Sequence, residues 1–422
     1  MVPVIKAMPR TRCILSALSV QSAGLLMLSL GAAALMRAQD IISSIPRAPA
    51  EPSVLRDQLP APPPSVPPAP PQTPFKLGSL VLRPHLSYSY MNAEGLPAAD
   101  GRRVASEIFT LSAGLTGDLG KYWTFDYSPS WRKYSARAMM DSDDLSASLK
   151  GMIPLPDMGL QFAEIYSQST PTLVETGQQT KQESWTTSLN TAYRFSPGIQ
   201  LQASGGMNER YTDIAPDMRT WNANVALNLA FSPRFSLNVG PSFSYNEIKN
   251  AADLYDEGYQ AEVSWKPTDK ITLAFTLGRQ YSYSKSSAGI NLSNPILNFM
   301  IGYQPFETTT LTFSAARTTM PSYFGDQVTD TSRWSVILNQ RLLGRFYLNA
   351  SYAPYDNSYT AIDLVTPAGR VDSVKSYNVS LSTQLFGRIS FAATYTLTKN
   401  DSNVSGFTFS TTQYGVQLGC NY

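Results

Sequence analysis

TWNANVALNLAF (Thr220–Phe231) and, after a three-residue turn, FSLNVGPSFSYN (Phe235–Asn246) are the stretches that decide the fold of this chain. In both, apolar residues recur at every second position, and successive side chains of a β-strand point to opposite faces. The positions between them carry mainly Ser and Asn, whereas the exposed face of a soluble β-sandwich is usually rich in Lys and Glu. Each run is about ten residues long, the span of a tilted transmembrane strand. The pattern predicts an all-β fold whose strands have one lipid-facing and one polar face.

The same alternation continues to the end of the chain and predicts a transmembrane antiparallel up-and-down β-barrel of about 18 strands. Two segments, 158–167 and 331–342, show the pattern weakly, so 16 strands is the alternative. An even number of strands places both ends of the barrel on the periplasmic side. The expected strands are 79–92, 104–116, 121–134, 143–153, 158–167, 183–195, 199–211, 219–231, 235–246, 257–266, 270–283, 295–304, 308–317, 331–342, 346–354, 374–386, 389–398 and 409–422.

The connections between these strands alternate between short turns and long loops. Gly and Pro mark the short turns, because they provide the backbone conformations that tight turns need. Short turns at one end and long loops at the other are typical of outer-membrane barrels, in which the short turns are periplasmic. The short turns are 117–120, 154–157, 196–198, 232–234, 266–269, 304–307, 343–345 and 386–388, and the longer loops include 168–183, 246–257, 284–294, 317–331 and 355–374.

The chain before the barrel divides into two segments. Residues 1–38 have the features of a secretory signal peptide: basic residues, an apolar stretch over 14–36, and Ala38 at the expected cleavage point. A single membrane anchor is the alternative, since the apolar stretch is long. Residues 39–76 are rich in Pro, which prevents regular helix or sheet, and are expected to form an extended periplasmic tether. The barrel is then expected to occupy residues 77–422.

Composition is typical of a membrane barrel. Charged residues make up 15% of the chain, against roughly 25% in soluble domains, and Tyr occurs 23 times. A net charge of +2 gives no reason to expect a nucleic-acid partner. Aromatic residues gather at strand ends, as they do at the two membrane–water boundaries of a barrel. Those near short turns are Phe195, Phe231, Phe235, Trp265, Phe306, Phe346 and Phe386, and those toward the loops include Tyr88, Tyr90, Trp131, Tyr211, Trp221, Tyr245, Tyr259, Tyr281, Tyr352 and Tyr377.

The last strand carries an alternating pattern that ends on an aromatic residue, with Tyr414, Val416, Leu418 and Tyr422 in phase. It resembles the C-terminal strand by which the barrel-assembly machinery recognises bacterial outer-membrane barrels, where the final residue is more often Phe or Trp. Residues 77–422 as a whole resemble Gram-negative porin-like barrels, and more weakly the barrels of exopolysaccharide export systems. The resemblance implies a location in the outer membrane. No segment before the barrel is long enough to form the plug of an energy-coupled receptor.

A barrel of 16 to 18 strands leaves an aqueous channel, so the polar face of each strand predicts the residues that line it. Basic residues outnumber acidic ones on this face, which predicts a mild preference for anionic solutes. Loops 168–183 and 355–374 are the best candidates, by length, to fold inward and constrict the channel. The charged or titratable lumen candidates are Arg83, His85, Asp126, Arg132, Lys150, Arg210, Glu262, Arg333 and Arg341.

The residues offer little support for an enzyme. His85 is the only histidine, and Ser87 lies on the same face, but no partner from another strand is marked by the sequence. Cys420 is the one cysteine expected in the mature chain, so a histidine- or cysteine-rich metal site is excluded and no cofactor is expected. The pairs Asp143–Asp144 and Asp256–Glu257 are expected to be solvated or to meet divalent ions held by lipopolysaccharide.

The leading hypothesis is a porin-like channel through which small hydrophilic solutes diffuse across the outer membrane without an energy source. The alternatives are the outer-membrane barrel of an exopolysaccharide export system, and a structural or adhesive barrel with a closed lumen. Outer-membrane lipid and lipopolysaccharide would surround the barrel, and the Pro-rich segment would contact a periplasmic partner or the cell wall. A homotrimer is a further expectation, with Ala203 and Gly205 as small outward residues that allow close contact.

Overall fold

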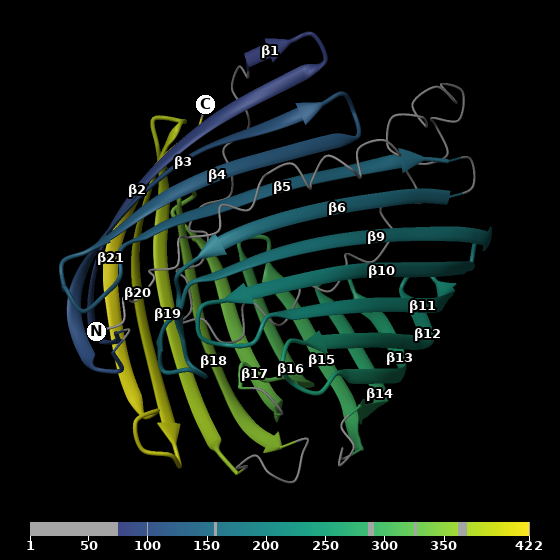
Figure 1. The fold of residues 1–422 in the computed structure, drawn as a ribbon. Coiled ribbons are helices and arrows are strands. Elements are labelled where there is room, and N and C mark those ends of the chain that lie inside the picture. Colours follow the sequence, from purple (N-terminus) through teal and green to yellow (C-terminus); the bar gives the residue numbers. More distant parts are fainter. Residues whose placement is uncertain are drawn as a thin grey trace.

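The computed structural model describes residues 75–421, apart from 99, 156–157, 286–290, 325–326 and 362–368. The expected signal peptide, the Pro-rich segment up to residue 74, and Tyr422 lie outside the described residues. The described strands form one continuous wall, and β2 (Leu80–Pro97) pairs with both β3 (Arg103–Leu119) and β21 (Phe409–Asn421), which closes the barrel (Figure 1). Among these residues, no helix is long and apolar enough to cross a membrane.

The other barrel strands follow one another around the wall in chain order, so the topology is up-and-down. They are β4 (Trp123–Tyr134), β5 (Ser142–Pro154), β6 (Met158–Ser169), β9 (Gln182–Ser196), β10 (Ile199–Thr212), β11 (Met218–Ser232), β12 (Phe235–Ile248), β13 (Leu254–Thr268), β14 (Ile271–Ser284), β15 (Leu292–Phe306), β16 (Thr309–Pro321), β17 (Gln327–Leu342), β18 (Phe346–Ala361), β19 (Val371–Leu385) and β20 (Ile389–Ser402). Three short strands are additional: β1 (Phe75–Leu77), paired with the start of β2, and the hairpin of β7 (Thr172–Leu173) and β8 (Gln178–Gln179).

The prediction of an 18-stranded barrel is confirmed, and the alternative of 16 strands is wrong. The two weakly patterned segments, 158–167 and 331–342, form β6 and most of β17, each paired along its length with both neighbours. In a closed barrel every strand has a partner on each side, so no row of backbone N–H and C=O groups is left exposed to lipid.

Several strands run further toward the long-loop end than the alternation predicted. β18 continues to Ala361 and β17 begins at Gln327, and the two still pair there, with Val328 opposite Thr360. Beyond the apolar band an outward side chain meets water and need not be apolar, so the period-two signal stops while the backbone ladder continues. The loop predicted at 355–374 is shorter for this reason, and most of what remains of it lies outside the described residues.

Strand register divides the side chains into an outward apolar set and an inward polar set. On the outward face, Trp221 lies opposite Met207 of β10 and Tyr245 of β12. The Trp221 side chain is 47% exposed, and Phe231, in phase with it near the short-turn end of β11, is 66% exposed. Large apolar groups arranged this way are unfavourable in water and favourable in lipid. The outward face is therefore that of a membrane-spanning barrel.

The short turns lie at one end of the barrel and the long loops at the other. Two of the turns, Leu343–Gly344 and Phe386–Gly387, have positive φ at both residues, between 49° and 73°. Each pair belongs to a three-residue connection, since Leu342 pairs with Phe346 and Leu385 with Ile389, and Gly adopts a positive φ at little cost. These turns hold consecutive strands in the register that alternates apolar and polar faces.

Candidate functional site

The strand register places the nine lumen residues named from the sequence on the inward face of the wall, opposite to the exposed apolar side chains. Their surroundings differ. Some are ion-paired or hydrogen-bonded to neighbouring strands, one is covered by a loop, and others face open space.

Two of the arginines are balanced by neighbouring carboxylates. Arg83 on β2 forms an ion pair with Asp118 on β3, and Arg132 on β4 lies 3.2 Å from Asp144 on β5. The expectation that Asp144 is solvated together with Asp143 is wrong, because strand alternation turns Asp144 inward to Arg132 and Asp143 outward. These pairings make the excess of positive charge in the lumen smaller than the polar faces of single strands suggested.

The His85 side chain on β2 reaches over β3 to a residue on β4. Its Nε2 atom lies 3.2 Å from the Oγ atom of Ser128 on β4, and that hydroxyl donates to Asp126 Oδ1 at 2.6 Å. The ring lies over Gly114 of β3, where a Cβ atom would be 2.2 Å from Nε2. The partner is thus Ser128 and not Ser87, which the sequence singled out. Asp126 accepts from the serine and not from the histidine, so the three residues lack the Asp–His–Ser order of a serine hydrolase.

The connection between β6 and β9 folds into the barrel at its long-loop end. We call residues 170–181 the inward loop. Within it, Val174 and Glu175 are fully buried, and Val174 packs against Val374 and Phe409, which face inward from β19 and β21. The expectation that this connection folds inward is confirmed. Apolar residues of the loop find a small core inside the mouth of the barrel, which holds the loop there.

Glu175 joins the inward loop to the far side of the mouth. Its carboxylate accepts hydrogen bonds from the Ser322 hydroxyl and, at 2.7 Å, from the Tyr323 backbone N–H, both just after β16. β6 and β16 lie on nearly opposite sides of the wall. A barrel of this size has a backbone diameter of roughly 35 Å, whereas the chain from Ser169 to Glu175 spans at most about 20 Å. The two loops therefore meet near the barrel axis.

Arg370, just before β19, holds the inward loop from a third direction. Its guanidinium donates to the backbone carbonyl of Glu175 at 2.7 Å and to both carboxylate oxygens of Asp372, whose side chain is fully buried. The Phe407 ring lies 3.5 Å from the guanidinium carbon, in a cation–π contact. A guanidinium can satisfy a carboxylate, a carbonyl and an aromatic face at once, because its donors and its flat face point in different directions.

We call the long-loop end of the lumen, where the inward loop contacts Tyr323 and Arg370, the packed mouth. Its packing changes the role expected of Arg210. The Arg210 guanidinium stacks on the Tyr323 ring at 3.9 Å and the residue is buried, so it supports the loops and is not part of an open wall.

The alternation of β10 was enough to predict that Arg210 faces inward, but Glu175 and Arg370 were not predicted from the sequence, because they lie in loops without periodicity. The sequence held one signal for Glu175: it directly follows two apolar residues, Leu173 and Val174, in an otherwise polar loop.

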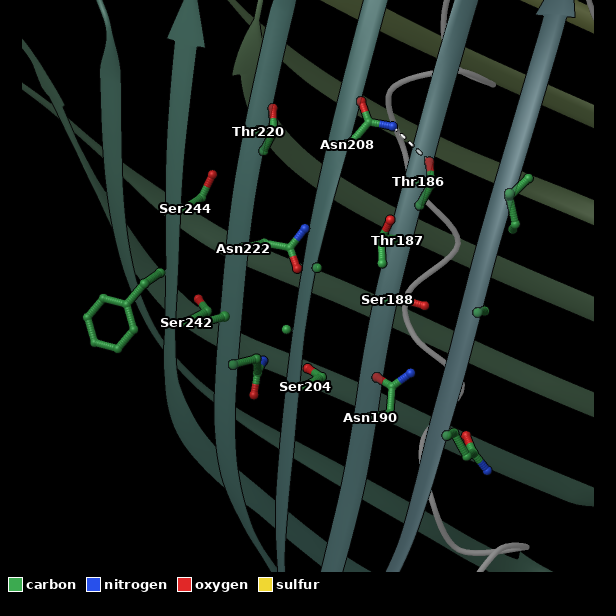
Figure 2. Close-up of a pocket in the computed structure, with 18 of the residues that line it drawn as sticks. Thr186, Thr187, Ser188, Asn190, Ser204, Asn208, Thr220, Asn222, Ser242 and Ser244 are labelled. Carbon is green, nitrogen blue, oxygen red and sulfur yellow. Dashed lines mark hydrogen bonds between the residues drawn. The ribbon is translucent and has the colours of Figure 1, made fainter. Parts of the chain in front are cut away.

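Beside the packed mouth, the lumen keeps an open cavity of about 940 Å³. Strands β9 to β15 supply much of its wall with Ser, Thr, Asn and Gln side chains, several of which Figure 2 shows. Lys150 of β5 borders it, and a cavity of about 620 Å³ lies beside Glu262 and Arg333. Within the described part of the chain, none of these three side chains forms an ion pair. Arg341 lies at the short-turn end and donates to the Gly344 carbonyl at 2.8 Å.

One carboxylate that was expected to be solvated is buried in the cavity wall. Asp256 on β13 faces inward and accepts hydrogen bonds from the Ser282 hydroxyl and, at 3.1 Å, from the Asn246 amide. Its neighbour Glu257 lies opposite the outward Phe243. Strand alternation separates the two carboxylates, so they do not form a solvated pair. Among the described residues, no cluster of three or more His, Cys, Asp or Glu side chains is placed to hold a metal ion.

No protein-family model and no curated protein matches this chain. Among solved structures it is similar to OpdK of Pseudomonas aeruginosa with vanillate, at 11% identity and a TM-score of 0.48, covering 82% of this chain and 100% of that one. OccK2 (OpdF) of the same organism, in complex with glucuronate, shares 12% identity at a TM-score of 0.47, covering 81% and 98%. The FrpB iron transporter of Neisseria meningitidis shares 14% identity at a TM-score of 0.45, and the match covers 76% of this chain and 62% of the transporter.

Proposed function

We propose that this protein is a porin-like channel of the Gram-negative outer membrane, through which small hydrophilic solutes diffuse without an energy source. The observation that carries the proposal is an open polar cavity inside a closed barrel whose outward face is apolar. An aqueous path across lipid needs both features. The inward loop limits the width of the path, because it meets the opposite loop near the barrel axis.

A mild preference for anions is part of the proposal. Lys150 and Arg333 are exposed to the lumen, whereas Arg83 and Arg132 are balanced by carboxylates. Exposed charges inside a pore raise the local concentration of ions of opposite sign. Because Glu262 borders the same cavity as Arg333, we expect the preference to be weak.

Single-channel recording of refolded residues 39–422 in a planar bilayer tests both parts. We expect steady conductance in KCl, and a reversal potential under a KCl gradient that gives chloride a permeability modestly above that of potassium. A folded barrel that never conducts would contradict the channel. A clear preference for potassium would contradict the reasoning from Lys150 and Arg333 while leaving the channel intact.

The packed mouth favours one other function, a structural or adhesive barrel with a closed lumen. The buried Glu175 and its contacts with Tyr323 and Arg370 would keep such a lumen shut. If this function is right, the wild-type protein conducts no ions in a planar bilayer, and it still conducts none when the inward loop is released.

The exopolysaccharide-export hypothesis depends on the Pro-rich segment, which lies outside the described residues, and it stays a prediction. It requires that deletion of residues 46–74 abolishes secretion while the barrel still assembles.

A further inference from the structure

We infer that the wall formed by β9 to β15 recognises neutral polyhydroxylated solutes, that is, sugars and polyols, inside the large cavity. The inference rests on the proposed channel and names its substrate class. Inward residues of adjacent strands form rows of amide and hydroxyl groups. In one row Asn190, Ser204, Asn224 and Ser242 lie opposite one another on β9, β10, β11 and β12, and all four line the cavity. Figure 2 shows Asn190, Ser204 and Ser242 of this row.

Two amides of β11 are available to a solute. Asn222 and Asn224 line the cavity, and neither forms a hydrogen bond to the part of the protein that the structure describes. An Asn side chain offers donors and an acceptor, so it can bond to both the O–H and the lone pairs of a sugar hydroxyl. An ammonium group only donates and a carboxylate only accepts. A pair of free amides therefore matches a neutral polyol better than it matches an ion.

Two glycines leave room on this wall for polar side chains of the neighbouring strands. Gly206 of β10 lies opposite Asn222, and a Cβ atom there would be 3.1 Å from the Asn222 Oδ1 atom. Gly258 of β13 lies opposite Ser242, whose hydroxyl oxygen would be 2.3 Å from an added Cβ atom. Because these positions carry no side chain, the Asn222 amide and the Ser242 hydroxyl can lie over the backbone of the two glycines. Both polar groups line the cavity, where a solute can reach them.

The charges of the cavity are placed away from this wall or are already satisfied on it. Asp256 belongs to the wall, and its carboxylate is buried and bonded to neighbouring side chains. Lys121 and Lys150 border the cavity from the β3–β5 side. The Arg317 side chain faces outward, where it is ion-paired with Asp330. Among the described residues of β9 to β15 that line the cavity, Asp256 is the only charged one, so a solute at this wall meets mainly amide and hydroxyl groups.

The cavity is large enough for a sugar, and hydrogen bonding dominates its chemistry. Binding cavities for small molecules measure about 300–1,000 Å³, and this one measures about 940 Å³. Hydrogen bonds to a solute replace hydrogen bonds to water, so each adds only modestly to affinity. Binding of this kind is weak and rapidly reversible, which suits passage through a channel.

The test is block of the ion current by maltose in planar bilayers that contain the refolded mature protein. We expect maltose to lower the single-channel current more than it lowers the bulk conductivity of the same solution, and gluconate to give no such excess. In the double variant Asn222→Ala, Asn224→Ala, the maltose concentration for half block should rise about threefold to tenfold. The control is Asn349→Ala, which removes an inward amide of β18 that is bonded to Asn339 and lies outside both cavities.

The outcomes separate the inference from the channel. Conductance without excess block by maltose, or with equal block by gluconate, would overturn the inference and leave the channel standing. A silent but folded wild-type protein would overturn both. If maltose blocks the double variant as strongly as it blocks the wild type, the β11 amides do not bind the solute. Heat-dependent migration on SDS gels checks folding, and Asn222→Ser replaces the double variant if that one does not fold.

Discussion

Release of the inward loop should widen the channel, and Glu175→Ala is the most direct way to release it. The Glu175 carboxylate is fully buried and accepts hydrogen bonds from the Ser322 hydroxyl and the Tyr323 backbone N–H. A hydrogen bond to a charged group contributes about 1.5–3 kcal/mol, so two contribute about 3–6 kcal/mol. The cost of burying the carboxylate offsets part of this sum. We therefore take about 3 kcal/mol as the loss of loop anchoring.

A loss of about 3 kcal/mol shifts the equilibrium between closed and open loop roughly 100-fold. A loop that is open for about 0.1% of the time would then be open for about a tenth of it. The strand ladders do not depend on Glu175, so the barrel should remain folded. Single-channel recording should show frequent events of higher conductance in Glu175→Ala, and fewer in Glu175→Gln, which keeps an acceptor oxygen.

The matched control is Glu247→Ala. This glutamate faces outward near the long-loop end of β12, away from the inward loop, and lies 3.7 Å from the Arg219 guanidinium. It should leave the recordings unchanged. If Glu175→Ala is a folded barrel with the conductance and open probability of the wild type, then Glu175 does not hold the loop across the mouth and the reasoning fails.

Three further predictions concern the wall and the mouth. Gly114→Ala places a Cβ atom where the His85 ring and the Ser128 hydroxyl lie, and should destabilise the barrel by about 1 kcal/mol in gel-shift melting. A second change, His85→Ala, should restore part of the loss, and absence of any rescue would contradict the contact. Lys150→Glu should move the reversal potential toward cation preference without altering melting, and an unmoved potential would show that Lys150 does not face the ion path. Arg370→Ala leaves the buried Asp372 without its cation, at a cost of about 3–5 kcal/mol, and should make the inward loop cleavable by protease in the intact barrel; an equally resistant loop would argue against the clamp.

Strand number, order and facing could be predicted from the sequence because they are local properties. A strand in lipid must present apolar side chains outward at every second position, whatever its neighbours are. Trp221 and Asn222 therefore reveal their faces without any knowledge of the rest of the barrel. The turns are local in the same sense, since Gly344 and Gly387 mark positions where φ is positive.

Only the tertiary structure decided which inward groups meet. Closure and register bring Arg83 to Asp118 and leave the Asn222 amide without a hydrogen bond to any residue that the structure describes, and no single strand contains that information. The mouth is the extreme case, because Glu175 bonds to Tyr323, a residue far away in the chain. Loops have no periodicity, and their positions depend on side chains from several distant segments at once. Alternation thus determined that the chain forms a hollow barrel, and long-range packing determined where the barrel is closed and where it stays open.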